Sequence, residues 1–133
     1  MQTAADSTQQ LLSDAAERAS RYLDGLAERP VVPPREALDR LAELGGPLPA
    51  GPSDPDEVLA LLDRAGSPAT VATAGPRYFG FVIGGTLPAC LAANWLAGAW
   101  DQNEGLRVMS PVAAAVEEIS LGWLVDIFGL PAG

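Results

Sequence analysis

Few residues in this sequence could perform chemistry, because it contains no histidine, no lysine and a single cysteine, Cys90. Zinc sites are usually built from cysteine and histidine, and serine or cysteine nucleophiles are commonly activated by a histidine. We therefore expect no metal site and no histidine-activated serine or cysteine nucleophile in this chain. Cys90 lies in an alanine-rich segment, which predicts a small buried apolar side chain.

Two further patterns invite a functional interpretation. Residues 81–86 read FVIGGT, and backbone amides ahead of a helix can bind an anion, but the spacing of known phosphate loops is absent, so we expect a turn. Residues 101–104 form a polar cluster directly after an apolar segment, and helix termination alone would explain them. Glu117 and Glu118 are expected on a solvated helix face.

Composition restricts the partners and the compartment. Seventeen acidic residues against eight arginines give a net charge of −9, which repels nucleic acid and anionic lipid. Residues 78–100 are uncharged over a length that could cross a bilayer, but their glycines, Pro88 and Asn94 favour burial inside a protein. The single cysteine and the absence of a signal-peptide pattern predict a cytoplasmic protein. With 48% hydrophobic residues, part of the surface is expected to meet another subunit or further sequence.

Hydrophobic periodicity predicts a mainly α-helical chain. An amphipathic helix of about twenty residues is expected from Asp6 or Ser7, followed by a proline-rich linker and a short helix over 35–44. Asp54 before Pro55 predicts a capped helix that ends near residue 66. Residues 67–85 should be extended or turning, and 87–100 helical.

The last predicted helix has the clearest boundaries. Ser110 is expected as its N-cap, Pro111 as its first residue and Gly129 as its C-cap. One side carries an apolar stripe of Val112, Val116, Ile119, Trp123 and Ile127.

The order of these features resembles a known enzyme family. The string PRYFGFVIGGTLPACLAANWLAGAWDQN over 76–103, then Ser110–Pro111, Glu117, Trp123 and GLP at 129–131, is similar to the N-terminal part of the group II pyridoxal-phosphate-dependent amino-acid decarboxylases. These enzymes act on aromatic amino acids, glutamate and related substrates.

The resemblance implies an α/β enzyme with the aspartate-aminotransferase-like fold, also called fold type I. Residues 1–75 would be a helical dimerisation segment, and 76–133 the start of the cofactor domain, ending before the pyridoxal-phosphate site. The implied function is a homodimeric carboxy-lyase that releases carbon dioxide from an L-amino acid, a small-molecule substrate, to give an amine. The lysine, histidine and aspartate that hold pyridoxal phosphate in the family have no counterpart here, so no cofactor-binding residue is assigned and this chain alone should be inactive.

The resemblance also assigns the candidate site residues. Six would line the substrate pocket: Tyr78, Phe79, Phe81, Val82, Ile83 and Gly84. Gly84 stands where some members of the family have a threonine near the substrate carboxylate. Gln102 and Asn103 would reach the partner subunit's pocket. Core packing is the alternative explanation for all eight residues, and a non-catalytic helical interaction or dimerisation module is the alternative for the chain.

Overall fold

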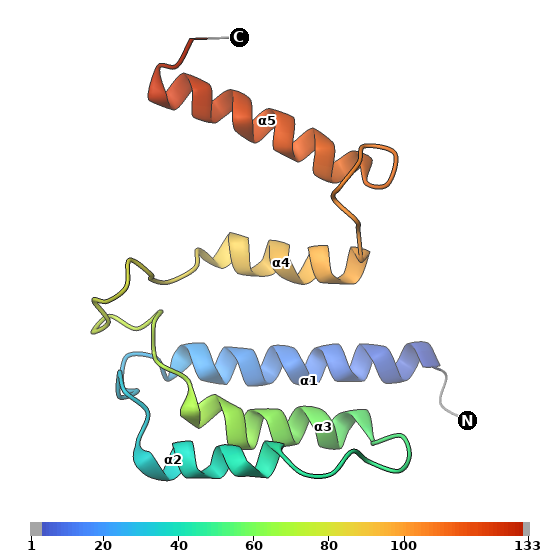
Figure 1. Ribbon diagram of the computed structural model, residues 1–133, viewed down its shortest axis with the longest axis vertical. Helices are drawn as coiled ribbons and strands as arrows, with labels where there is room; N and C mark the ends of the chain where they lie inside the picture. The colour runs from blue at the N-terminus through green and yellow to red at the C-terminus, as the bar shows by residue number, and fades with distance from the viewer. Residues whose placement is uncertain (1–3, 132–133) are drawn as a thin grey trace. The chain divides into compact units, whose positions relative to one another are not determined.

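A computed structural model describes residues 4–131, with side chains from residue 7, and they form helices and turns without a strand (Figure 1). This confirms the mainly α-helical prediction. The chain divides into two compact units, one ending at Gly85 and the other beginning at Thr86. The division expected at 75/76 rests on the resemblance and stays a prediction.

Helix α1 spans Ala4–Asp24 and is the longest helix of the first unit. It begins earlier than predicted, so Asp6 and Ser7 lie inside it and the expectation that either caps it was wrong. The alanines at positions 4 and 5 are strong helix formers, and they extend the helix past these local cap candidates. Beyond α1, turns lead to the prolines at 30, 33 and 34.

The short helix predicted over 35–44 is present but changes type halfway. Helix α2 spans Arg35–Asp39, and the 3-10 helix η1 continues it over Arg40–Leu44. Gly45 caps η1 with an extended backbone, donating its N–H to the Ala42 carbonyl at 3.1 Å. Ion pairs along the exposed side join Arg35 to Asp39 and Arg40 to Glu43.

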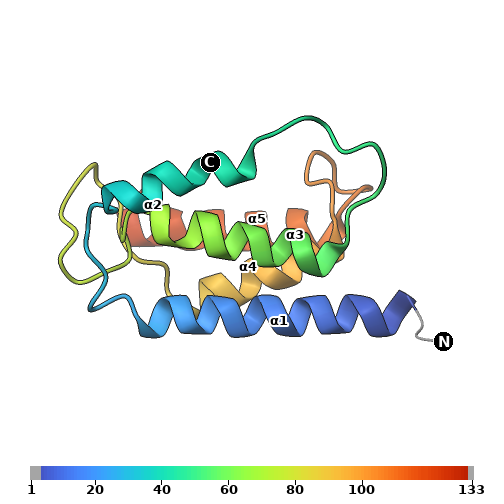
Figure 2. The same ribbon diagram turned by 90° about the horizontal axis from the view of Figure 1, so that it is seen from below.

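Helix α3 spans Pro55–Leu61 and starts as predicted. The Asp54 carboxylate accepts hydrogen bonds from the Asp56 N–H at 2.9 Å and from the Glu57 N–H at 3.4 Å. A wider π-helical turn, η2, continues over Leu62–Gly66, and the 3-10 turn η3 covers Ser67–Ala69. Figures 1 and 2 both show α3 between α1 and α2.

The first unit is held by small buried residues and by polar bridges. Its fully buried apolar positions in the described chain are alanines and a proline: Pro33, Ala37, Ala65 and Ala72. Arg18 joins α1 to η2, because its guanidinium donates to Asp14 and to Asp63, each at 2.9 Å. These hydrogen bonds to Asp14 and Asp63 raise the pKa of Arg18 above its usual value.

A second bridge ties the end of α1 to the segment around η3. The Arg29 guanidinium lies 4.3 Å from the centre of the Tyr22 ring and donates to the Ser67 carbonyl. The Tyr22 hydroxyl is 2.9 Å from that of Thr70. Cation–π and hydrogen-bond contacts thus replace a large apolar core at this end of the unit.

In the second unit, helix α4 spans Pro88–Trp100 and α5 spans Pro111–Phe128. The Ser110 hydroxyl oxygen accepts a hydrogen bond from the Ala113 N–H at 3.3 Å, and Ser110 is only 1% exposed. Gly129 adopts φ 60° and ends α5, with the Leu130 N–H donating to the Val125 carbonyl. The predicted boundaries of α5 are therefore confirmed.

Helix α5 exposes apolar side chains on two opposite sides. One side is the predicted stripe of Val112, Val116, Ile119, Trp123 and Ile127, and each of these is exposed. The other side carries Leu121, Leu124 and Phe128, also exposed. At 100° per residue the two sides lie roughly 140° apart. A helix with this distribution is typical of a protein interior.

Candidate functional site

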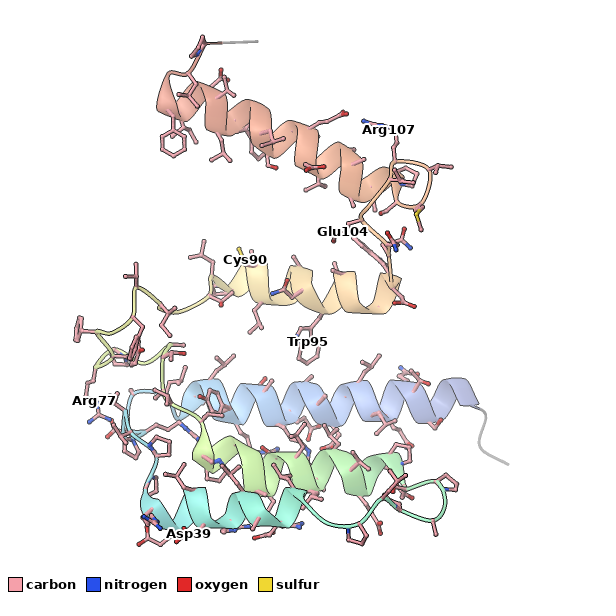
Figure 3. All side chains as sticks on the ribbon, viewed as in Figure 1. Asp39, Arg77, Cys90, Trp95, Glu104 and Arg107 are labelled. Carbon is pink, nitrogen blue, oxygen red and sulfur yellow. The ribbon has the colours of Figure 1, made fainter. Side chains whose placement is uncertain are left out.

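The segment that the resemblance assigns to the substrate pocket forms an exposed loop, here called the apolar loop, residues 78–84. Its start is anchored to the first unit, since the Arg77 guanidinium donates to the Arg29 carbonyl at 2.6 Å. The Ala72 N–H donates to the Val31 carbonyl at 3.3 Å just upstream. Figure 3 shows Arg77 at the base of this loop.

The apolar loop contains a tight turn. The Ile83 N–H donates to the Gly80 carbonyl at 3.2 Å, and the two central residues have positive φ, 52° at Phe81 and 56° at Val82. Positive φ at both central positions is the pattern of a type I′ turn, which favours glycine, asparagine and aspartate. The Tyr78 ring lies against Gly80, where an added Cβ would come within 3.2 Å of the tyrosine hydroxyl.

The predicted pocket residues lie mostly at the surface of the described chain. Phe79, Phe81 and Val82 are almost completely exposed, at 93%, 91% and 106%, and Ile83 and Gly84 are also exposed. Tyr78 is half-buried. A pocket lined by these side chains needs atoms from outside the first unit, because a nearly fully exposed side chain has no opposing wall.

Gln102 and Asn103, assigned to the partner's pocket, are exposed and make local hydrogen bonds in the second unit. The Gln102 amide donates to the Trp100 carbonyl at 2.8 Å, and the Asn103 side-chain oxygen accepts from the Gly105 N–H at 3.0 Å. Asp101 ends α4 with φ 48°, its N–H donating to the Ala97 carbonyl. Helix termination therefore accounts for the polar cluster at 101–104, and the proposed contact with a partner stays a prediction.

An ion pair that sequence reasoning missed lies beside the first turns of α5. The Arg107 guanidinium contacts the Glu118 carboxylate, which lowers the pKa of Glu118 and raises that of Arg107. Glu118 was expected only on a solvated face. The sequence did contain a signal for this pair. Arg107 is the one basic residue after Arg77, so it is the one basic partner that this part of the sequence offers to an acidic side chain.

The same region contains an open hollow of about 370 Å³. Its lining combines two carboxylates with a hydroxyl and small apolar groups: Glu104, Ala113, Val116, Glu117 and Ser120. The Ser120 hydroxyl donates to the Glu117 carbonyl at 2.9 Å, which is a bond within the helix. Figure 3 places Glu104 and Arg107 on the segment that leads into α5.

Cys90 corrects one sequence expectation. It is exposed near the start of α4, not buried, because α4 as a whole has little cover, and every one of its residues except Leu91 is exposed. Among residues 4–131, no group of three or more histidine, cysteine or acidic side chains is placed to bind a metal ion. The described helices also include none with the length and apolar character needed to cross a membrane.

Comparison with protein-family models, with curated proteins and with solved structures found no match to this chain.

Proposed function

We propose that this chain is part of a pyridoxal-phosphate-dependent amino-acid decarboxylase, in which it contributes the apolar loop to the substrate-pocket wall and helical surface to a homodimer. The observation that carries the proposal is the order of features along the sequence, from the aromatic and glycine-rich loop through the alanine-rich helix to the Ser110–Pro111 start of α5. The assembled enzyme would be a soluble carboxy-lyase that acts on an L-amino acid.

The exposed apolar surface supports this role. Both apolar sides of α5 and the tip of the apolar loop lack cover within their own units. Large exposed apolar areas mark surfaces that meet other protein. A helix with two uncovered apolar sides suits the interior of a larger α/β enzyme better than it suits a peripheral position.

The residues of this chain do not fit the cofactor. Pyridoxal phosphate is held covalently by a lysine and supplies the electron sink for loss of carbon dioxide, and this sequence has no lysine. The cofactor would therefore be bound by residues outside these 133. The part played by this chain is to shape the pocket, exclude water from it and hold the two subunits together.

The test is to isolate the native polypeptide that contains this sequence and look for the cofactor. Trypsin cleaves after Arg77 and after Arg107, so the peptide 78–107 identifies the protein by mass spectrometry. We expect an internal-aldimine absorbance band and release of carbon dioxide from at least one L-amino acid. A native polypeptide with neither property would refute the proposal.

The pocket assignment has its own test in that native protein. Phe81→Ala should raise KM for the accepted amino acid, because Phe81 would face the substrate, whereas Ser13→Ala on an exposed part of α1 is the control. Equal kinetics for the two variants would remove Phe81 from the pocket wall.

A helical interaction module is the second candidate, and the exposed sides of α5 are the observation that favours it. In that case the native polypeptide would contain no cofactor, and it would be recovered in a stable complex with another chain. Cooperative unfolding of the isolated 133-residue chain as a monodisperse species would also favour the module.

A further inference from the structure

The apolar loop contains a turn whose backbone does not suit its residues. Positive φ at both Phe81 and Val82 brings each Cβ close to backbone atoms, and a β-branched residue such as valine is especially disfavoured there. Turns of this type normally have glycine or asparagine at the two positions. The sequence instead places Gly84 and Gly85 after the turn, where φ is not positive.

The surroundings do not compensate for this strain. A left-handed conformation of a non-glycine residue persists when packing around it over-determines the backbone. The Phe81 and Val82 side chains are nearly fully exposed, and the turn is closed by the hydrogen bond from the Ile83 N–H to the Gly80 carbonyl. No packing therefore holds the turn in its present conformation, and the backbone can change when these side chains become buried.

A second copy of this chain is the occupant that charge and area favour. The net charge of −9 opposes self-association, but residues 78–100 contain no charged side chain, so two copies can meet there without opposing like charges. Phe79 and Phe81 offer about 300–500 Å² per copy when buried. With Val82 added, the two copies approach the roughly 1,000 Å² that a stable interface requires.

We propose that the apolar loop is a two-state segment. Its left-handed turn is the uncovered state, and when a second copy covers Phe79, Phe81 and Val82, residues 81 and 82 move to negative φ. This inference rests on the proposed function, because it uses the dimer surface, and it adds a conformational change that couples the shape of the pocket wall to dimer formation.

The test compares Val82→Gly with Val82→Ala in the 133-residue chain. Both substitutions remove the apolar side chain, but only glycine accepts positive φ without strain, so only V82G stabilises the uncovered turn. Sedimentation velocity over a concentration series should show weaker self-association for V82G than for V82A by about 5- to 30-fold. The nuclear Overhauser effect between the amide and α protons of residue 82, which is strong at positive φ and weak at negative φ, should report the change when it is measured in dilute and concentrated wild-type chain.

Each outcome bears on a separate claim. Equal association of V82G and V82A, or positive φ at residue 82 in the associated form, would overturn the two-state loop and leave the homodimer of the proposed function intact. A chain that stays monomeric at every concentration would overturn the second copy as occupant. The decarboxylase assignment is decided separately, by the aldimine band of the native polypeptide.

Discussion

The Asp54 carboxylate is predicted to stabilise the start of α3, and its removal should destabilise the first unit. The carboxylate accepts from the N–H groups of Asp56 and Glu57, two donors that have no partner within the helix. Asp54 is exposed, so Asp54→Ala removes the hydrogen bonds with little change in packing. Loss of such a cap costs about 1 kcal/mol, within a range of about 0.5–2.

The geometry places the expected loss near the middle of that range. The bond to the Asp56 N–H is short at 2.9 Å, whereas the bond to the Glu57 N–H is long at 3.4 Å. One strong hydrogen bond and one weak one therefore justify about 1 kcal/mol and not the upper limit. In a unit of 60–100 residues, this corresponds to a fall in Tm of about 4–8 °C.

Urea unfolding followed by far-UV circular dichroism, together with hydrogen exchange of the α3 amides, would measure this effect. Asp54→Asn keeps an oxygen acceptor and should lose less than half as much. Asp56→Asn is the matched control, because it removes one negative charge from the same helix end without removing the cap. The capping argument is refuted if D54A and D56N lower the free energy of unfolding equally, since charge alone would then explain both.

Further predictions concern the polar bridges and the end of α5. Arg107 lowers the pKa of Glu118, so their ion pair stabilises the second unit fully at pH values above the ordinary glutamate pKa. This stabilisation is lost as the pH falls through the lowered pKa. A pH titration of α5 helicity should show the acid loss in the wild type and not in Glu118→Gln. Arg18→Met should lower the Tm of the first unit by an amount that shrinks in 1 M salt, and a loss independent of salt would contradict an ionic role. Tyr22→Leu should lose about 0.5–1 kcal/mol more than Tyr22→Phe in urea unfolding, because phenylalanine keeps the ring beneath Arg29. Gly129→Ala should destabilise the end of α5 by about 1–2 kcal/mol, visible as faster exchange of the Leu130 amide, whereas Gly122→Ala in the helix interior should slow exchange.

Helix boundaries set by local side-chain chemistry could be predicted from the sequence. Asp54 with Pro55, and Ser110 with Pro111, fix helix starts through hydrogen bonds within three residues. The start of α1 was mispredicted, because helix propensity at positions 4 and 5 outweighed the nearby cap candidates. The change to a 3-10 helix at Arg40 could not be predicted from nearby residues. It is accompanied by packing of η1 against η2, which is distant in sequence.

The candidate site was less predictable than the fold. The family resemblance singled out the apolar loop, but the positive φ of Phe81 and Val82 contradicts their residue preferences and could not be predicted from the sequence. Gln102 and Asn103 form hydrogen bonds with backbone groups two residues away. These hydrogen-bond partners depend on the residue at which α4 ends. The pair of Arg107 and Glu118 needed the fold of the intervening segment.

The small buried residues of the first unit invert the usual pattern of tolerance to substitution. Three of its four buried apolar positions are the alanines Ala37, Ala65 and Ala72, while leucines such as Leu38 and Leu62 remain exposed in this chain. Enlarging a buried alanine to leucine would push neighbouring helices apart, whereas shortening an exposed leucine would leave no void. A saturation mutagenesis map of this unit would therefore single out its smallest side chains as the intolerant sites.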